Sequence, residues 1–318
     1  MRPILLGIVA AFFFSVTFIL NRAMELAGGS WIWSASLRYI FMIPFLAAIV
    51  MFRGNFVPLM RELKARRLEW LLWSTVGFGL FYAPLTFAAG YGPGWLIAGT
   101  WQITIISGSL LVPLFYETIQ TESGPISVKG RIPYRGLAMS LIILLGIALM
   151  QMEHMNQLSW QNVFLCMVPV IIASFAYPLG NRKMMAVCGG RLDAYQRVLG
   201  MTLASLPFWA VLVTWELFSS GLPSVEQTVQ SLIVAVSSGV IATVLFFQAT
   251  DLVKNNMIKL AAVEATQSME VVFALAGEIF LLSAPLPAMV SLIGMIIVVV
   301  GMVLHSYVSQ SDSMKKAA

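Results

Sequence analysis

The stretch Asn21-Arg22-Ala23-Met24, followed by Gly28-Gly29, recurs 160 to 161 residues later as Asn181-Arg182-Lys183-Met184, followed by Gly189-Gly190. The same spacing, within one residue, separates Arg38 from Arg197 and Gly79 from Gly239. Because this offset is about half of the 318 residues, the pattern predicts two similar halves.

The composition predicts a membrane protein. Hydrophobic side chains make up 59% of the chain and charged ones 10%, against about 25% charged in soluble domains. So few charges could not cover the surface of a water-soluble domain. A span of about 20 residues crosses ~30 Å of hydrocarbon, and we expect ten: Pro3–Leu20, Trp31–Met51, Trp70–Tyr91, Trp95–Tyr116, Ile132–Met150, Gln161–Gly180, Ala194–Trp215, Val229–Thr250, Lys259–Leu282 and Ala288–Tyr307. The predicted fold class is an all-α integral membrane protein with ten transmembrane helices.

Each half carries five of these helices. Because five is odd, the second half must enter the membrane from the side opposite to the first. We expect a first five-helix repeat at residues 1–151, a second at 160–309, and a cytoplasmic C-terminal tail at 310–318. Two inverted repeats favour alternating access.

The basic residues fall on one side of the predicted spans. Of 19 Lys and Arg residues, 16 belong to that side, Arg22 alone belongs to the other, and Arg38 and Arg197 lie within helices. Short cytoplasmic loops retain Lys and Arg, so both termini are predicted to be cytoplasmic, in a multi-pass protein of the plasma or inner membrane. The basic residues form no continuous face for nucleic acid. The two cysteines, Cys166 and Cys188, indicate neither a disulfide nor a metal site.

Two segments resemble a known family, the drug/metabolite transporter superfamily. Residues 268–275, Ser-Met-Glu-Val-Val-Phe-Ala-Leu, are similar to its acid-then-Pro-Val-Phe-Ala segment without the proline, and residues 36–40, Ser-Leu-Arg-Tyr-Ile, are similar to its second helix. The resemblance is to the ten-helix EamA-like members, of multidrug resistance efflux type, and implies a transporter of small molecules. The four-helix pumps of this superfamily carry a proton-binding glutamate in their first helix, which here has no acid between Arg2 and Arg22.

Acidic residues within one span are candidates for ion coupling. A charge at the bilayer centre costs at least ~2.5–3.5 kcal/mol, so such residues are functional candidates by default. The helix predicted at Lys259–Leu282 places Glu264, Gln267 and Glu270 within an arc of ~120°, which suits the wall of a central path. Glu270, near mid-membrane, is the first candidate to bind a proton or cation, and Glu264 is its alternate.

Structural roles remain open for the other intramembrane charges. Arg38 and Arg197 lie close enough to the predicted helix ends for their guanidinium groups to reach the interface or a helix terminus. Glu264 is alternatively the partner of Arg197 in a buried ion pair, because both are predicted toward the cytoplasmic side.

Large polar and aromatic side chains at mid-helix are candidates for solute binding. Trp101 and Gln102 are too large for a close-packing role, and the ring of Trp101 offers a cation–π surface. Further candidates within the predicted spans are Gln267, Tyr82, Tyr177 and Gln248.

The sequence thus favours a secondary active transporter, namely a proton-coupled exporter of small organic solutes. Its expected partners are the solute, protons and the lipid bilayer, and it is expected to be a monomer or homodimer. The sequence has no Walker loop for a nucleotide, so we do not expect ATP to drive transport directly. We also expect no cofactor, no metal, no nucleic acid and no enzymatic activity. Two alternatives stay open: import of a choline-like or amino-acid-like metabolite, and a membrane-embedded lipid enzyme. The second would need a His/Asp or metal cluster, whereas His154 and His305 are predicted on opposite sides of the membrane.

The charge distribution gives a topology that cysteine labelling can test. A reagent added outside intact cells should reach single cysteines introduced near Gly94, Asn156, Gly221 and Ala284, and should miss those near Lys64, Lys129 and Lys315. Labelling from outside at Lys64 or Lys129 would contradict the inverted arrangement.

Overall fold

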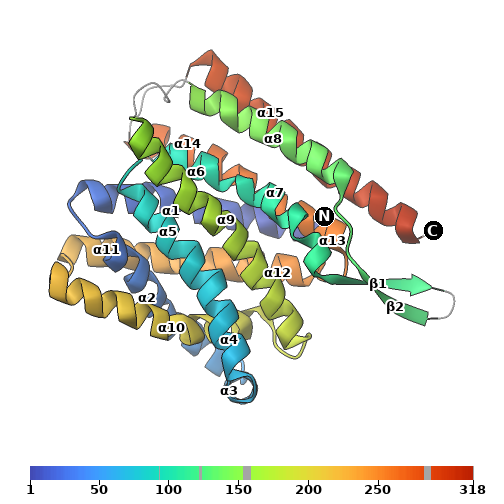
Figure 1. The fold of residues 1–318 in the computed structure, drawn as a ribbon, viewed down its shortest axis with the longest axis horizontal. Coiled ribbons are helices and arrows are strands. Elements are labelled where there is room, and N and C mark those ends of the chain that lie inside the picture. The colour runs from blue at the N-terminus through green and yellow to red at the C-terminus, as the bar shows by residue number, and fades with distance from the viewer. Residues whose placement is uncertain (93, 122–123, 153–158, 283–287, 318) are drawn as a thin grey trace.

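The structure, a computed structural model, describes residues 1–92, 94–121, 124–152, 159–282 and 288–317 as a bundle of helices (Figure 1). The connectors at 153–158 and 283–287, which contain Asn156 and Ala284, therefore lie outside the described residues. The elements are α1 (Arg2–Leu26), α2 (Trp31–Phe52), α3 (Phe56–Ala65), α4 (Arg67–Ser74), η1 (Thr75–Gly79), α5 (Leu80–Ala89), α6 (Gly94–Trp101), α7 (Ile103–Leu110), η2 (Val112–Leu114), β1 (Tyr116–Thr121), β2 (Gly124–Lys129), α8 (Tyr134–Met152), α9 (Trp160–Cys188), α10 (Ala194–Ser219), α11 (Val225–Val234), η4 (Ala235–Ala242), α12 (Thr243–Asp251), α13 (Met257–Ala265), η5 (Thr266–Ser268), α14 (Met269–Leu282) and α15 (Met289–Ala317).

Each of the ten predicted spans corresponds to one helical rod, because several neighbouring elements are continuous. The composite rods are α4–η1–α5, α6–α7, α11–η4–α12 and α13–η5–α14, in which η1 and η4 are π-helical and η5 is a 3₁₀ turn. Six helices are long and apolar enough to cross a membrane, and shorter apolar helices cover Leu96–Leu110, Tyr134–Leu149 and Met289–His305. The chain is an all-α membrane protein.

The first rod of each half packs against rods of the other half. α1 packs on the α11–η4–α12 and α13–η5–α14 rods, and its counterpart α9 packs on the α4–η1–α5 and α6–α7 rods. α2 packs on α10, and α8 lies beside α15 at one edge of the bundle (Figure 1). The π segments also correspond, because Thr75 and Ala235 begin them 160 residues apart. This is the packing expected of two repeats related by a two-fold axis.

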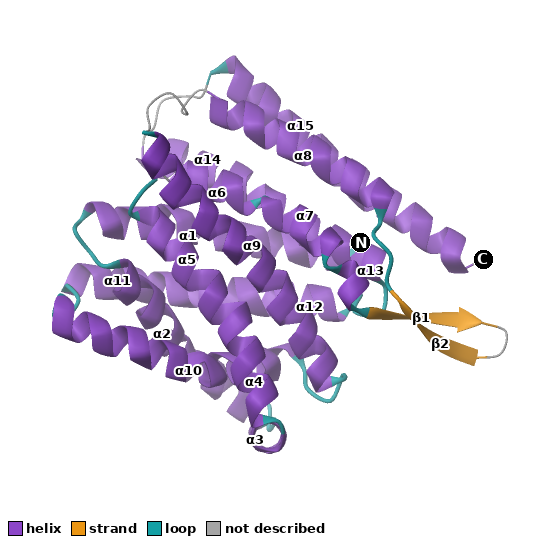
Figure 2. Cartoon of the chain, in the orientation of Figure 1, coloured by secondary structure: helices purple, strands orange, loops and turns teal. Residues whose placement is uncertain are grey.

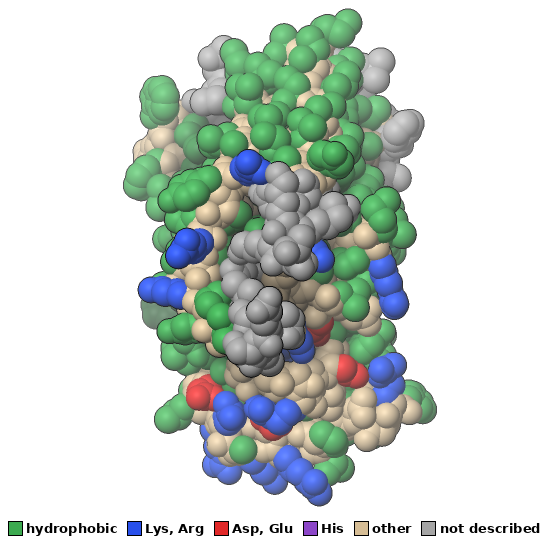
Figure 3. Space-filling view, turned by 90° about the vertical axis from the view of Figure 1, so that its right-hand side faces the viewer, with side chains coloured by type: hydrophobic (Ala, Val, Ile, Leu, Met, Phe, Trp, Pro, Cys, Tyr) green, Lys and Arg blue, Asp and Glu red, His purple; other side chains and the backbone are tan. Residues whose placement is uncertain are grey.

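A β-hairpin and the two chain ends lie on one side of the bundle. β1 and β2 pair antiparallel with Tyr116 opposite Lys129, and they are the orange arrows of Figure 2. Both labelled termini lie toward the same side (Figure 1), and the face seen from there carries scattered Lys and Arg side chains (Figure 3). α15 runs on to Ala317, so residues 310–317 of the expected tail are helical.

The two halves approach backbone to backbone at a pair of glycines. A Cβ built on Gly180 of α9 would lie 2.2 Å from the Cα of Gly77 in η1. Small residues allow such close contact between membrane helices, where dispersion contacts rather than the hydrophobic effect hold helices together.

We predict that Gly180→Ala destabilises the bundle, because the added methyl group would overlap the Gly77 backbone and force α9 away from η1. Overpacking of this kind costs about 1–3 kcal/mol and should lower the melting temperature of the detergent-purified protein. Gly90→Ala is the matched control, since its Cβ would lie 3.4 Å from its nearest neighbour, the Phe87 carbonyl oxygen. Equal melting temperatures for the two variants would contradict the packing argument.

Candidate functional site

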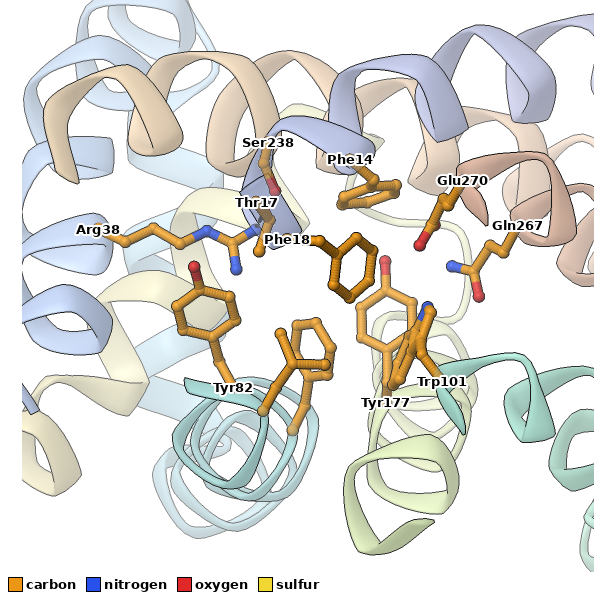
Figure 4. A pocket seen from close by; sticks show the side chains of 12 residues that line it. Phe14, Thr17, Phe18, Arg38, Tyr82, Trp101, Tyr177, Ser238, Gln267 and Glu270 are labelled. Atoms are coloured by element: carbon orange, nitrogen blue, oxygen red, sulfur yellow. Dashed lines mark hydrogen bonds between the residues drawn. The ribbon is translucent and has the colours of Figure 1, made fainter. Parts of the chain in front are cut away.

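A cavity lies where rods of both halves meet (Figure 4). It is lined by Phe14, Thr17 and Phe18 of α1, Arg38 of α2, Phe81, Tyr82 and Leu85 of α5, Trp101 of α6, Tyr177 of α9, Ser238 of η4, Gln267 of η5 and Glu270 of α14. The cavity volume is about 20 Å³. One water needs ~10–15 Å³, so this conformation has room for about one water and not for an organic solute.

Arg38 supplies the positive end of the cavity. Its side chain is buried and points into the cavity from α2 (Figure 4). Nη2 donates a hydrogen bond to Ser238 Oγ at 3.0 Å, and the guanidinium carbon lies 4.0 Å from the centre of the Tyr82 ring. Nε and Nη1 have no hydrogen-bond partner among the described residues. Within that part of the chain, no acidic side chain forms an ion pair with Arg38.

The π segment η4 brings Ser238 to this arginine. π-helical turns inside longer helices are frequent at functional sites, and here Gly239 follows Ser238. A Cβ on Gly239 would lie 2.6 Å from Met42 Sδ and 3.5 Å from Arg38 Nε. The glycine therefore lets α2 pack closely on η4, at the point where the Arg38 hydrogen bond forms.

Glu270 supplies the acidic end of the cavity. It lies in the first turn of α14 with 1% of its surface exposed, and Trp101 lines the cavity beside it (Figure 4). Gln267, one turn earlier in η5, is buried and lies next to it (Figure 4). Among the described residues, no basic side chain forms an ion pair with Glu270.

Aromatic rings connect the two ends. The Phe81 ring centre lies 4.5 Å from that of Tyr177 and 5.1 Å from that of Trp101. The hydroxyl groups of Tyr177 and Thr17 have no hydrogen-bond partner in the described part of the chain, although buried polar groups are normally paired. The cavity therefore leaves polar atoms at both ends available to a guest molecule.

Five residues proposed from the sequence for coupling or solute binding line this cavity: Tyr82, Trp101, Tyr177, Gln267 and Glu270.

The other two expected solute-binding residues lie elsewhere. Trp101 lines the cavity, whereas the next residue, Gln102, does not. Gln102 is buried, but its Nε2 donates to the Ala98 carbonyl oxygen of its own rod at 3.1 Å. Gln248 lies ten residues after Ser238, the point at which its rod reaches the cavity, and does not line it.

The predicted ion pair between Arg197 and Glu264 is wrong. Glu264 of α13 binds Arg182 of α9 through two parallel hydrogen bonds, Nε to Oε1 at 2.9 Å and Nη2 to Oε2 at 2.5 Å. Arg197 of α10 instead binds Asp251 at the end of α12, with Nη1 2.5 Å from Oδ1. Both arginines are buried.

Hydropathy did not identify Arg182 as an intramembrane residue, because α9 is longer than its apolar stretch. The span was expected to end at Gly180, whereas α9 continues to Cys188. The signal that could have identified Arg182 is the predicted repeat, in which it occupies the position of Arg22. Arg22 is also tied inside the bundle, since its Nη1 donates to the Ala89 carbonyl oxygen at 2.6 Å.

Some cavity residues carry no sequence signal at all. Phe14, Phe18, Phe81 and Leu85 are ordinary members of apolar helices, and only the packing of the helices determines that they face the cavity.

Within the described ranges, no group of three or more His, Cys, Asp or Glu side chains could hold a metal ion. His154 lies outside the described residues, and His305 is buried on α15.

Comparisons with known proteins identify relatives over the whole chain. The family model "EmrE: Putative multidrug resistance efflux transporter" matches residues 1–311. The uncharacterized protein YjlA of Bacillus subtilis (strain 168) is 59% identical over 318 residues, which cover 100% of this chain and 98% of YjlA. An uncharacterized 42.1 kDa protein of Shouchella clausii, from the 3′ region of intracellular alkaline protease, is 50% identical over 270 residues, 85% of this chain and 70% of that protein.

A crystal structure of another protein has a similar fold. It superposes with a TM-score of 0.68, covering 97% of this chain and 98% of the other. At 14% sequence identity, this likeness concerns the fold alone.

We predict that Arg182 and Glu264 are strongly coupled in stability, while Arg197 and Glu264 are not. Arg182→Gln or Glu264→Gln alone leaves a buried charge without its partner, which costs about 3–5 kcal/mol. The double variant should recover much of this loss, as measured by melting temperature in detergent. For the matched pair Arg197→Gln and Glu264→Gln the losses should add. Additive losses for the first pair, or recovery for the second, would refute the assignment.

Proposed function

The chain belongs to the EmrE family of multidrug resistance efflux transporters, within the drug/metabolite transporter superfamily, and we propose that it exports small organic solutes in exchange for protons. Transport is the function of the family; the direction, the coupling ion and the residues that carry them are our proposal. The cavity between the two halves is the proposed solute site.

The position of Glu270 on the cavity lining is the observation that supports this proposal most directly. Glu270 is the acidic residue of the cavity lining, and it has no ion-pair partner among the described residues. A carboxyl group in such a place is held either as the neutral acid or as a carboxylate beside a cation. A proton and a cationic group of the solute would therefore compete for it, and this competition enforces exchange.

Glu264 is less suited to this role. Its two oxygens are engaged by the planar fork of Arg182, so they are already paired and are not available to a solute. Taking up a proton at Glu264 would leave the buried Arg182 without its counter-charge.

We assign the Arg182–Glu264 pair to closure of the cavity. Arg182 lines a second hollow together with Lys183 and Lys254, next to the hairpin. Glu264 lies one turn before Gln267, which lines the central cavity. The pair thus stands between the hollow and the cavity. Separating α9 from α13 would break it and join the two spaces, as alternating access requires.

The proposed topology places the basic face in the cytoplasm. The hairpin and both termini lie toward that face (Figures 1 and 3), which agrees with retention of Lys and Arg on the cytoplasmic side. The halves proposed as repeats are residues 1–151 and 160–309.

We predict that Glu270→Gln folds but loses transport driven by a pH gradient. Glutamine keeps the size and hydrogen bonding of the protonated acid but cannot exchange a proton. In proteoliposomes, flux of phenethylamine, L-phenylalanine or 3-phenylpropanoate, whichever the parent protein transports, should fall to the level of protein-free vesicles. Flux with the pH dependence of the parent would refute coupling at Glu270.

Glu62→Gln is the matched control for this experiment. Glu62 lies on α3, away from the cavity, and Arg191 lowers the pKa of its carboxyl by donating a hydrogen bond to it. Its carboxylate stays ionised across the working pH range, so Glu62→Gln should transport like the parent.

A further inference from the structure

We infer that the solute of the central cavity is a zwitterion, with an anionic group that lies against Arg38 and a cationic group that lies against Glu270. The inference rests on the proposed transport function, because it names the class of solute for the same cavity. It follows from the two charges at opposite ends of the cavity, neither of which has a counter-charge among the described residues (Figure 4).

The Arg38 end lacks an anion. A guanidinium group stays charged in proteins and has five N–H donors, and burial of a charge is costly unless it is paired. Here Nη2 reaches Ser238 and the group stacks on Tyr82, but Nε and Nη1 find no partner in the described chain. A carboxylate or phosphate is the group that such a fork binds best. The unpartnered hydroxyl of Thr17 lies at the same end (Figure 4).

The residue that corresponds to Arg38 in the second half has a counter-charge, which Arg38 lacks among the described residues. Arg197, the repeat counterpart of Arg38, is buried to a similar degree but is neutralised by Asp251. The residue 160 positions before Asp251 is Tyr91, which carries no charge. The protein therefore provides a counter-ion in one half and omits it in the half whose arginine faces the cavity.

The Glu270 end suits a cation. An ionised carboxylate is only an acceptor, and the rings of Trp101 and Tyr177 beside it offer the negative faces that attract ammonium groups. Phe14 and Phe18 lie between the two ends (Figure 4), and the Phe81 ring contacts both Tyr82 and Trp101, so the middle of the solute is expected to be apolar.

Solutes with a single charge fit this cavity less well. A simple amine would satisfy Glu270 but would bring a second cation into the space that Arg38 already occupies. A simple carboxylate would satisfy Arg38 but would oppose the charge of Glu270. A zwitterion pairs both groups and adds no net charge to the buried site.

Two sets of matched compounds test the inference on the purified full-length protein. Each set keeps one skeleton and removes one charge: L-phenylalanine, phenethylamine and 3-phenylpropanoate, and L-leucine, 3-methylbutylamine and 4-methylpentanoate. Affinities are measured from the rise in melting temperature with concentration. At least one zwitterion should bind about tenfold or more tightly than both of its singly charged relatives, the factor that one charge-assisted hydrogen bond supplies.

Variants assign each charge to its end of the solute. Arg38→Gln should remove the preference for the zwitterion over the amine, and Glu270→Gln should remove its preference over the carboxylate. Arg197→Gln is the matched control, because it deletes the same charge outside the cavity and should leave the ranking unchanged. If Arg38→Gln does not fold, Arg38→Lys keeps the charge without the fork and should reduce the preference only in part.

The inference is overturned if the amines bind as tightly as the zwitterions, or if no zwitterion stabilises the protein. Flux measured in proteoliposomes separates this failure from failure of the proposed function. Gradient-driven flux of an amine together with no zwitterion binding would keep proton-coupled export and reject the zwitterionic solute. Preferential zwitterion binding with no gradient-driven flux of any of the six compounds would reject proton coupling and keep the zwitterionic solute.

Discussion

A charged side chain among apolar helices needs a counter-charge or hydrogen-bond partners, because water cannot solvate it there. Two pairs meet this need here: Arg182 with Glu264, and Arg197 with Asp251. The first pair ties α9 to α13 and the second ties α10 to α12, so each fixes how two rods are rotated against one another. Arg38 and Glu270 have no counter-charge among the described residues, and both face the central cavity. The distribution of buried charge thus separates positions that hold the bundle together from positions available to a solute.

Close packing explains why the cavity is nearly closed in this conformation. Gly77 and Gly180 let η1 and α9 touch through their backbones, and Gly239 lets η4 approach α2. The rings of Phe81, Tyr177 and their neighbours then fill the remaining space, which leaves room for about one water. Packed interiors change between discrete arrangements rather than deform continuously. Admission of a solute therefore requires whole rods to move, and the exchanged packing of the two halves provides two related sets of rods that can do so.

The two halves share their backbone packing but differ in the chemistry of their side chains. Arg197 has Asp251, whereas the corresponding position for Arg38 is occupied by Tyr91. Glu270 belongs to the fourth rod of the second half, and the fourth rod of the first half provides Trp101, which lines the cavity beside it (Figure 4). A symmetric scaffold thereby encloses an asymmetric site, in which one end is cationic and the other acidic.

Much of this protein is determined by its sequence alone. Hydropathy locates the ten rods because each span must be apolar over its own length, and the 160-residue offset predicts two similar halves because equivalent helices keep equivalent residues. Charge and size marked Glu270 and Trp101, since a mid-span carboxyl or a large polar ring is rarely needed for packing. The partners of the charges were not determined in this way. That Arg182 rather than Arg197 binds Glu264, that Gln102 bonds to its own rod, and that Arg38 faces the cavity all depend on which rods are neighbours and how each is rotated. Those relations arise from contacts between distant segments, such as that of Arg38 with Ser238, 200 residues away, and no local pattern in the sequence specifies them.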